Sequence, residues 1–289
     1  MKGRVCIVTG ANAGIGRVTA LELARLGATV VLVCRSQERG AQALAEIRQL
    51  SNNQDVHLLL ADLSSIADTI ALAGRFRTQF DRLDILVNNA GAYFTRRLTS
   101  ADNLEMTFAL NHMGYFVLTT MLLDILKTSG PARIINVSSD AHRGAKLDFD
   151  DLQAKKQYSA FRTYGRSKLA NVLFTYELAR RLENQSVTVN ALHPGFVASN
   201  FATNNGGLAR LFYRWIVPLI ALTPEKGAET AIFLASSPVV EGVTGQYFYQ
   251  KNAVRSSPDS YDETAARRLW AESQALMESL GGRAAASPI

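Results

Sequence analysis

Short apolar runs rich in valine and isoleucine alternate along this chain with longer segments in which apolar residues recur every three to four positions. Runs such as 30–33 and 134–137 place apolar residues on both faces, which is typical of parallel strands covered by helices on each side. The alternation predicts a doubly wound α/β sheet with right-handed crossovers. We expect strands at about 4–9, 28–34, 55–60, 84–88, 132–138, 186–192 and 244–249.

The segments between these strands have helical periodicity, with polar residues on the opposite side of each apolar stripe. We expect helices at about 14–26, 37–51, 65–80, 101–128, 158–183, 224–236 and 262–280. Neither an internal repeat nor a shift in composition marks a second domain, so one domain is expected over residues 1–280. Residues 281–289 lack periodicity and are expected to form a flexible tail.

The composition is that of an ordinary folded protein, with 47% hydrophobic and 19% charged residues. Lysine and arginine number 31 against 25 acidic residues, a net charge of +6 that mildly favours anionic ligands. The basic residues form only isolated pairs without interleaved aromatic residues, so we expect no nucleic-acid partner.

Two cysteines, Cys6 and Cys34, fall within apolar strand segments and are expected to be buried free thiols in a reducing compartment. The four histidines lie in separate predicted elements, so we expect no metal site. The chain enters its first strand directly after Met1-Lys2-Gly3-Arg4, so we expect neither a signal peptide nor an anchor helix, and a cytoplasmic location. No apolar stretch of about 18 residues predicts a membrane span elsewhere.

A glycine-rich turn, TGANAGIG at residues 9–16, joins the first strand to the first helix. Glycines let the backbone turn tightly and approach a phosphate, and the free amides of a helix N-terminus attract its negative charge. Although a plain turn is the alternative, the position favours a dinucleotide pyrophosphate. The spacing TGxxxGxG differs from GxGxxG.

The end of the second predicted strand bears on the choice of nicotinamide cofactor. An NAD-selective site usually places an acidic residue there, whereas this chain has Arg35 and Ser36. Both can bind a 2′-phosphate, and Arg17 adds positive charge beside the glycine turn. The alternative is that the arginines only make the surface soluble, but their place beside the turn favours NADP(H) as the cofactor. Asp62, after the third strand, is placed either to hold the adenine amino group or to cap a helix.

Tyr164 and Lys168 lie four residues apart in a helical segment and therefore share a face. A phenol with a pKa near 10 is a poor base, and lowering this pKa by about three units requires roughly 4 kcal/mol of phenolate stabilisation. A nearby ammonium in a dry cleft supplies much of that. Such pairs are common in helices, so the pair alone is weak evidence of a proton-handling centre.

Other polar residues lie where strands are expected to end, at the edge of the sheet where ligands bind. Ser139 can bind a substrate oxygen or satisfy local backbone, and the second reading is preferred for Ser138. The NNAG motif at 88–91 has small residues that let a nucleotide pass. Asn111 is costly inside a helix unless its side chain has a specific partner.

Together these motifs resemble the short-chain dehydrogenase/reductase family, of the retinol dehydrogenase-like kind, over about residues 3–250. The motifs are TGANAGIG, Asp62-Leu63, NNAG, Asn111, VSS at 137–139, YGRSK at 164–168 and Pro194-Gly195. The resemblance implies a Rossmann-type sheet of about seven strands in order 3-2-1-4-5-6-7. It also implies a homodimer or homotetramer built on the helices at 101–128 and 158–183.

The same resemblance implies a catalytic tetrad, in which Tyr164 is the general acid/base and Ser139 orients the substrate oxygen. Lys168 would hold the nicotinamide ribose and lower the pKa of Tyr164, and Asn111 would hold a water molecule. Pro194 and the residues after it would enclose the nicotinamide. The residues expected to bind the cofactor are Gly10, Asn12, Ala13, Gly14, Ile15, Gly16, Arg17, Arg35, Ser36, Asp62, Leu63, Asn88, Ala90, Gly91, Tyr164, Lys168, Pro194, Gly195, Val197 and Ser199.

The segment at about 197–224 is the expected substrate lid, and its aromatic and aliphatic residues suggest a lipophilic aldehyde, ketone or alcohol as substrate. Its apolar face is equally consistent with packing on the core or on a second subunit, and contact with a membrane surface is a weaker alternative. His142 either borders the substrate or, as we expect, is a solvated loop residue. A catalytically silent dinucleotide sensor or scaffold and a protochlorophyllide reductase-like enzyme are the competing functions.

Overall fold

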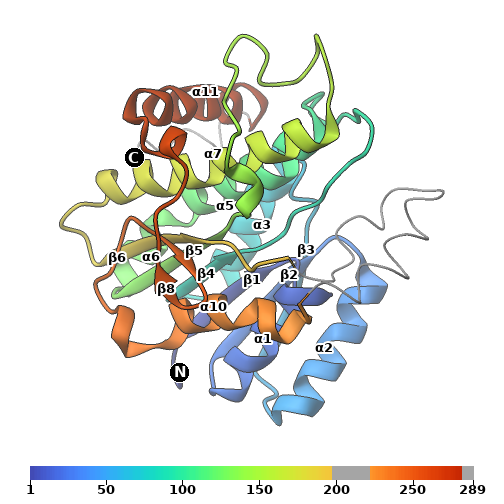
Figure 1. Cartoon of the computed structure of the whole chain (residues 1–289). Coiled ribbons are helices and arrows are strands. Elements are labelled where there is room, and N and C mark those ends of the chain that lie inside the picture. Colours follow the sequence, from blue (N-terminus) through green and yellow to red (C-terminus); the bar gives the residue numbers. More distant parts are fainter. Residues whose placement is uncertain (197–221, 282–289) are drawn as a thin grey trace.

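An eight-stranded sheet forms the centre of the computed structural model, which describes residues 1–196 and 222–281 (Figure 1). The strand order β3-β2-β1-β4-β5-β6-β7-β8 confirms the expected order of the first seven strands, all parallel. A short antiparallel edge strand, β8, was not expected. The strands are β1 Val5–Thr9, β2 Thr29–Cys34, β3 Val56–Leu60, β4 Ile85–Asn88, β5 Ala132–Val137, β6 Val187–Leu192, β7 Gln246–Tyr249 and β8 Asn252–Ala253.

Helices cover both faces of the sheet (Figure 1). The α-helices are α1 Gly14–Arg25, α2 Gln37–Ser51, α3 Ile66–Gln79, α4 Met106–Phe108, α5 Gly114–Met121, α6 Leu123–Ser129, α7 Ala160–Arg181, α10 Pro224–Ser236 and α11 Glu263–Gly281. Four short helices of other types complete the described part: the π-helix η1 Ala109–Met113 and the 3₁₀ turns η2 Asp140–His142, η4 Pro238–Val240 and η5 Pro258–Tyr261.

Successive residues of each strand enter two different hydrophobic cores because side chains alternate across a sheet. Cys6 and Val8 of β1 pack with residues of α1, α2 and α10. Ile7, between them, joins the larger core with residues of α3, α5, α7 and α11. The sheet is thus the middle of three layers, which leaves the carboxyl ends of its strands as the edge where polar residues gather. Both cysteines are free and buried, as expected.

The prediction of a single helix at 101–128 was wrong. The chain first makes an antiparallel bridge between Thr99 and Glu105, and the Glu105 carboxylate then accepts hydrogen bonds from the amides that begin α4. The π-helix η1 interrupts the helical repeat, and a bend of 54° separates Met106–Met121 from Leu123–Ser129. This break has a function in the fold, because η1 carries Asn111.

Residues 197–221, which hold most of the expected lid together with Val197 and Ser199, lie outside the described residues, as do 282–289 of the expected tail. Immediately outside the first gap, the Leu222 amide donates a 2.7 Å hydrogen bond to the Phe196 carbonyl. Among the described helices none is by itself long and apolar enough to span a bilayer, and one bent pair, Met106–Met121 with Leu123–Ser129, passes on length and composition.

Candidate active site

The glycine turn between β1 and α1 has the close backbone approaches that a nucleotide site requires. Gly10 and Gly14 have positive φ angles of 66° and 54°, which favour glycine. A Cβ on Gly16 would lie 2.5 Å from the Gly10 carbonyl oxygen and 2.4 Å from Asn89 Nδ2. The turn can therefore adopt this path only with glycine at these positions.

The start of α1 differs from the starts of neighbouring helices in a way that suits an anion. Ser36 and Ser65 cap α2 and α3 with their hydroxyls, whereas Ala13 gives α1 no side-chain cap and no acidic residue lies in its first turn. Uncapped amides at a helix N-terminus form a ready anion site. The residues of the turn thus fit the pyrophosphate of a dinucleotide.

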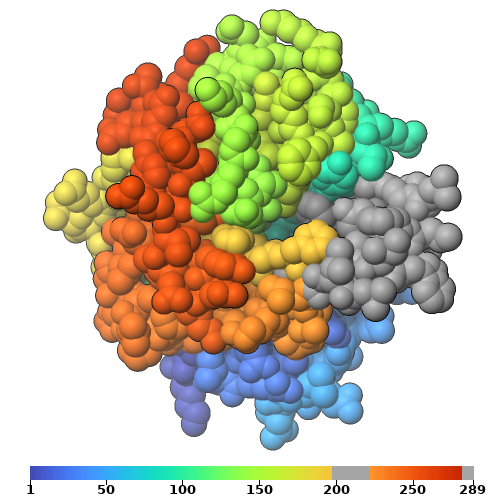
Figure 2. All heavy atoms as spheres, viewed as in Figure 1, coloured from blue at the N-terminus to red at the C-terminus, as the bar shows by residue number. Residues whose placement is uncertain are grey.

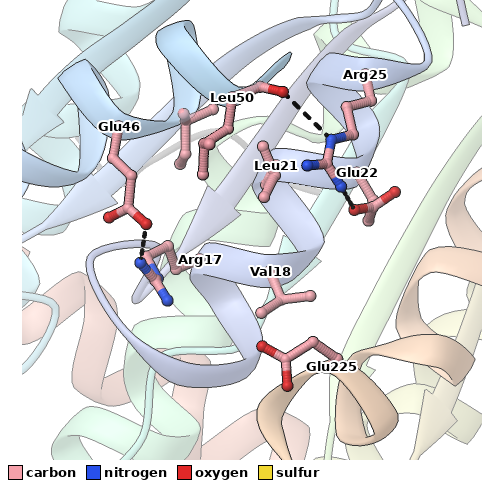
Figure 3. Close-up of a pocket in the computed structure, with 9 residues that line it drawn as sticks. Arg17, Val18, Leu21, Glu22, Arg25, Glu46, Leu50 and Glu225 are labelled. Atoms are coloured by element: carbon pink, nitrogen blue, oxygen red, sulfur yellow. Dashed lines mark hydrogen bonds and ion pairs between the residues drawn. The ribbon is translucent and has the colours of Figure 1, made fainter.

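Two neighbouring cavities, each of about 270 Å³, lie between α1 and α2 and share Arg17 and Glu46. The first is lined mainly by Val18, Leu21 and the end of α2, and Figure 3 shows Arg17 and Glu46 facing each other at its rim, joined as an ion pair. Arg17 was expected to face a cofactor phosphate. In the structure Glu46 neutralises it, although both side chains are more than a third exposed, so the pair is weak.

The second cavity adjoins the glycine turn and is lined by Asn12, Ala13, Gly14 and Arg17 together with Arg39, Gln42, Ala43 and Glu46 of α2. Arg39 and Gln42 were missed in the sequence. Arg39, Gln42 and Glu46 recur every three to four residues along α2 and therefore lie on one face of the helix. This spacing is the sequence signal from which they could have been predicted.

Arg35 lies at the end of β2 and is 64% exposed, with its guanidinium 3.4 Å from the Asp62 carboxylate. Burial opposes ionisation of Asp62, but hydrogen bonds from Ser64 and the nearby Arg35 hold the pKa of Asp62 below its usual value. Ser36 caps α2 by accepting from the Arg39 amide. Arg35 is therefore a largely solvated cation beside the site, loosely held and able to take an anionic partner.

Thr9 ties the glycine turn to the end of β4. Its hydroxyl accepts hydrogen bonds from the amides of Asn89 and Ala90 at 2.8 and 2.9 Å. Asn89 in turn donates from Nδ2 to the Thr9 carbonyl at 2.7 Å. The NNAG motif is thus fixed against the turn, which places Ala90 and Gly91 between the two halves of the site.

Asn88 and Leu63 were expected to bind the cofactor, but their side chains make contacts within the protein. Asn88 is fully buried and donates to Thr119 and Asn136, both at 2.9 Å, joining the sheet to the helix layer above it. Leu63 is buried in the larger core and packs beside Gly114.

Asn111 is fully buried and fixes the backbone that follows NNAG. Its Oδ1 accepts from the Ala92 amide at 2.9 Å, and its Nδ2 donates to the Ala92 carbonyl and to Ser167 Oγ, both at 3.0 Å. The π-helix presents Asn111 to both partners. A Cβ on Gly91 would lie 3.2 Å from Asn111 Oδ1 and 3.5 Å from Lys168 Nζ, so these three residues meet at one point.

Lys168 and Tyr164 lie on the face of α7 that packs against the ends of β4 and β5. Lys168 Nζ donates to the Val137 carbonyl at 2.9 Å and lies 5.7 Å from the ring centre of Tyr164. Burial lowers the pKa of Lys168 to about 7. The Tyr164 ring is 9% exposed and meets Tyr93 edge to face at 5.8 Å. The geometry brings a buried amine and a phenol together at the edge of the sheet.

Ser139 follows β5 and is partly exposed, whereas Ser138 is buried and donates to the Lys168 carbonyl at 2.8 Å, as its structural interpretation requires. The turn after Ser139 lies against α7, because a Cβ on Gly165 would come within 2.7 Å of the Ala141 carbonyl. The four expected catalytic residues therefore converge on one edge of the sheet from η1, the end of β5 and α7.

The expectation that His142 is a solvated loop residue was wrong. Its side chain is fully buried and contacts Ser139, Ser257 and Tyr247. After β6, Gly195 has a φ of 83° and packs on Leu222 and Tyr249, and His193 stacks on Tyr249 with ring centres 4.1 Å apart. Pro194 and Gly195 thus lie at the carboxyl edge of the sheet, where the nicotinamide segment was expected.

Within residues 1–196 and 222–281, no group of three or more His, Cys, Asp or Glu side chains could hold a metal ion. The absence of a metal from the reaction stays a prediction.

The comparisons with known proteins agree with this geometry. A family model for short chain dehydrogenases matches residues 4–207. Retinol dehydrogenase 14 of Mus musculus is 41% identical over 289 residues, covering 96% of this chain and 86% of that protein. An uncharacterised protein from Mycobacterium paratuberculosis has 30% identity and a TM-score of 0.78, covering 96% of this chain and 94% of its own.

The Pseudomonas aeruginosa RhlG/NADP active-site complex has 28% identity and a TM-score of 0.68, and the alignment covers 91% of this chain and 97% of the other. The family match covers well over half of the chain, and the match to the retinol dehydrogenase covers 96% of it. The chain therefore belongs to the short-chain dehydrogenase/reductase family, in its retinol dehydrogenase-like branch, and is an oxidoreductase that acts on CH–OH donors.

Proposed function

We propose that this protein uses NADP(H) to interconvert a lipophilic aldehyde or ketone and its alcohol. The observation that carries the proposal is the meeting of Gly91, Asn111 and Lys168 beside Tyr164, at the opposite end of the site from Arg17 and Arg35. Tyr164 and its neighbours are placed to transfer a proton to the carbonyl oxygen of the substrate. The two arginines offer positive charge where a 2′-phosphate would lie.

The nicotinamide cofactor supplies or accepts the hydride. Tyr164 donates its hydroxyl proton to the alkoxide oxygen in reduction and takes it back in oxidation. Ser139 donates a hydrogen bond that holds the same oxygen. Lys168, in its charged form, stabilises the tyrosinate that remains after the proton leaves.

The choice of NADP(H) is supported by three arginines, Arg17, Arg35 and Arg39, around the end of β2 and the glycine turn, and by Arg35 and Ser36 standing where an NAD-selective site usually has an acidic residue. Arg35 is loosely held by Asp62 and can exchange this partner for a phosphate at little cost. The related RhlG complex holds NADP.

A lipophilic substrate is supported by the aromatic residues around Tyr164. Tyr93 packs on its ring, and the Tyr158 hydroxyl fixes the neighbouring Phe94 by donating to its carbonyl at 2.7 Å. The named activity of the relatives, retinol dehydrogenase, is that of enzymes acting on a long apolar alcohol. We propose a retinoid or an aliphatic aldehyde of similar polarity.

The test is NADPH oxidation by the purified full chain with all-trans-retinal, nonanal and, as a hydrophilic comparison, glyceraldehyde. We expect turnover of the first two and loss of kcat by at least about 100-fold in Tyr164→Phe, which should still bind NADPH. NADPH binding without turnover of any of the three, and identical behaviour of Tyr164→Phe, would point instead to a silent dinucleotide sensor. Absence of NADPH binding would overturn both functions.

A further inference from the structure

His142 lies three residues beyond Ser139 in the turn after β5, and no step in the proposed reaction uses it. We propose that His142 is a positioning residue, which clamps the Ser139 turn to the segment 254–262 and so fixes the Ser139 hydroxyl for the carbonyl oxygen. This inference rests on the proposed function, in which Ser139 binds that oxygen.

The two ring nitrogens of His142 have different partners. Nε2 lies 2.9 Å from the backbone nitrogen of Ser257, and Nδ1 lies 2.7 Å from the carbonyl oxygen of Ser139. A backbone amide can only donate, so Nε2 must be the unprotonated acceptor. The network therefore assigns the proton to Nδ1, which donates to Ser139.

The second bond bears directly on the orientation of Ser139. Its carbonyl is held by His142, and its hydroxyl accepts a 3.2 Å hydrogen bond from the Ala141 amide. With its lone pair engaged by that amide, the hydroxyl keeps its own hydrogen to donate to a substrate oxygen. Displacing the carbonyl would rotate the Ser139–Asp140 peptide and shift the adjoining peptide, whose Ala141 amide holds the hydroxyl.

The turn is held from two sides. On the inner side it lies against α7 at Gly165, the residue after Tyr164, where there is no room for a Cβ beside the Ala141 carbonyl. On the outer side the segment after β8 covers it, as Figure 2 shows where the orange-red C-terminal segment meets the green loop that follows Ser139. A clamp at this point sets the distance between Ser139 and Tyr164.

The outer segment is a firm support because it is itself bound to α7. The Tyr176 and Ser256 hydroxyls lie 2.7 Å apart, and Ser256 and Ser260 share a second bond of 2.6 Å. Tyr261 stacks on the Tyr176 ring at 5.3 Å. Since Tyr164 and Tyr176 belong to the same helix, His142 closes a ring of contacts that begins and ends on α7.

The surroundings keep His142 neutral. Asp140 and Arg143 flank it in its own turn, the Tyr247 hydroxyl of β7 lies 3.4 Å from Nδ1, and His193 approaches from the end of β6. Burial lowers the pKa of His142, against the bond to Ser139, which raises it. A second ring proton would face the Ser257 amide hydrogen, so only the neutral form makes both bonds.

Three substitutions separate the two bonds. In His142→Asn the side-chain amide reaches the position of Nδ1 and can still donate to Ser139, whereas in His142→Gln it reaches that of Nε2 and can only meet Ser257. We expect kcat with nonanal and NADPH to fall about 10- to 100-fold in His142→Ala and His142→Gln, and only a few-fold in His142→Asn. NADPH affinity should be unchanged in all three.

A cycle with Ser139→Ala distinguishes positioning from general loosening of the fold. If His142 acts through the Ser139 hydroxyl, His142→Ala should lower the single-turnover rate in wild type but change it less than about twofold in Ser139→Ala. An equal loss in both backgrounds, or no loss in wild type, would overturn the proposal.

Amide hydrogen exchange tests the clamp without any turnover. In His142→Ala the Ser257 amide should exchange up to about tenfold faster, while amides of β4 keep their protection. If this change is seen but wild type reduces none of the aldehydes, the proposed function fails and the clamp stands as a structural contact. If the Ser257 amide exchanges as in wild type, the clamp itself is wrong.

Discussion

Lys168 Nζ donates a 2.9 Å hydrogen bond to the Val137 carbonyl, which joins the helix α7 to the end of β5. The side chain is 3% exposed, and its burial lowers the pKa to about 7. The Tyr115 ring, 5.8 Å away, closes the site from α5. The lysine is therefore poised to change charge near neutral pH while remaining fixed beside Tyr164.

The depressed pKa of Lys168 predicts how stability depends on pH in the cofactor-free protein. In the unfolded chain a lysine pKa is about 10.4, so between pH 7 and that value the unfolded state binds a proton that the folded state lacks. The free energy of unfolding should then rise with pH over this window. We expect urea denaturation at pH 7.0, 8.0 and 9.0 to show the rise in wild type but not in Lys168→Met.

The difference between these two proteins is the quantity to compare, because other groups also titrate. Burial raises the pKa values of Tyr115, Tyr176 and Tyr247, which opposes the trend above about pH 10. Equal pH slopes for wild type and Lys168→Met below pH 9 would show that Lys168 is charged in the folded protein throughout this range.

Arg35 should discriminate between the two nicotinamide cofactors. A charge-assisted hydrogen bond to a phosphate is worth about 1.5–3 kcal/mol, so Arg35→Ala should weaken NADPH binding roughly 10- to 100-fold. NADH affinity should stay the same. Fluorescence titration of both cofactors measures the ratio, and a parallel loss of NADH binding would mean that Arg35 supports the fold of the site rather than the 2′-phosphate.

Glu46 should weaken NADPH binding because it neutralises Arg17 at the rim of the cavity. The pair is partly exposed and worth at most about 1 kcal/mol, so Glu46→Gln is expected to tighten NADPH binding by up to about fivefold. Glu22→Gln is the matched control, because it removes the same charge from α1, the helix of Arg17, but Glu22 pairs with Arg25 instead. A similar effect of both substitutions would indicate a general change in net charge, not release of Arg17.

The strands and their order follow from the sequence because their residues are apolar on both faces, a pattern that a buried parallel sheet requires. Some site residues could be predicted for a related reason. Gly16 and Gly91 lie where another backbone or side chain comes so close that a Cβ atom would be crowded, and such positions favour glycine. Periodicity and glycine position are local properties. They can be read from one chain.

What could not be read depends on partners distant in sequence. Asn111 was recognised as costly in a helix, yet its partners, Ala92 and Ser167, lie 19 and 56 residues away in the chain. His142 was expected to be solvated because its cover, Ser257, comes from the opposite end of the chain. Arg39 was missed because its place beside Arg17 depends on how α2 packs on α1.

Asn111 should contribute to stability as well as to the site. Replacing it with leucine keeps similar volume but leaves the Ala92 amide and carbonyl buried without their partner. Each such group costs about 1–3 kcal/mol, so Asn111→Leu should lower the free energy of unfolding by roughly 2–6 kcal/mol. Asn111→Asp keeps the acceptor for the Ala92 amide but buries a carboxyl group against the Ala92 carbonyl, so it should also lower the stability. Equal stability of Asn111→Leu and wild type, by urea denaturation, would contradict this role.

The helix α11 bears on the homodimer or homotetramer that the family resemblance implies. It packs along α7, as Figure 1 shows, and Trp270 inserts between Phe116 of α5 and Phe174 of α7 at 5.0 and 5.8 Å between ring centres. The Arg181 guanidinium lies over the Trp270 ring, 4.2 Å from its centre. Every residue of α7 from 167 to 178 is buried within one chain.

Because residues 167–178 are already covered within one chain, we expect this stretch of α7 to make no subunit contact while α11 is in place, so that a homodimer or homotetramer would use other residues. Light scattering compares the mass of the wild type with the 31.5 kDa of one chain, and substitutions in α7 should leave the wild-type mass unchanged. Trp270→Ala should cost about 3–5 kcal/mol of stability, because it removes the side chain that seals this face. Arg268→Ala, an exposed neighbour on the same helix, is the control and should cost less than about 1 kcal/mol. A wild-type dimer that dissociates in variants of α7 would show that α11 moves aside to admit a partner.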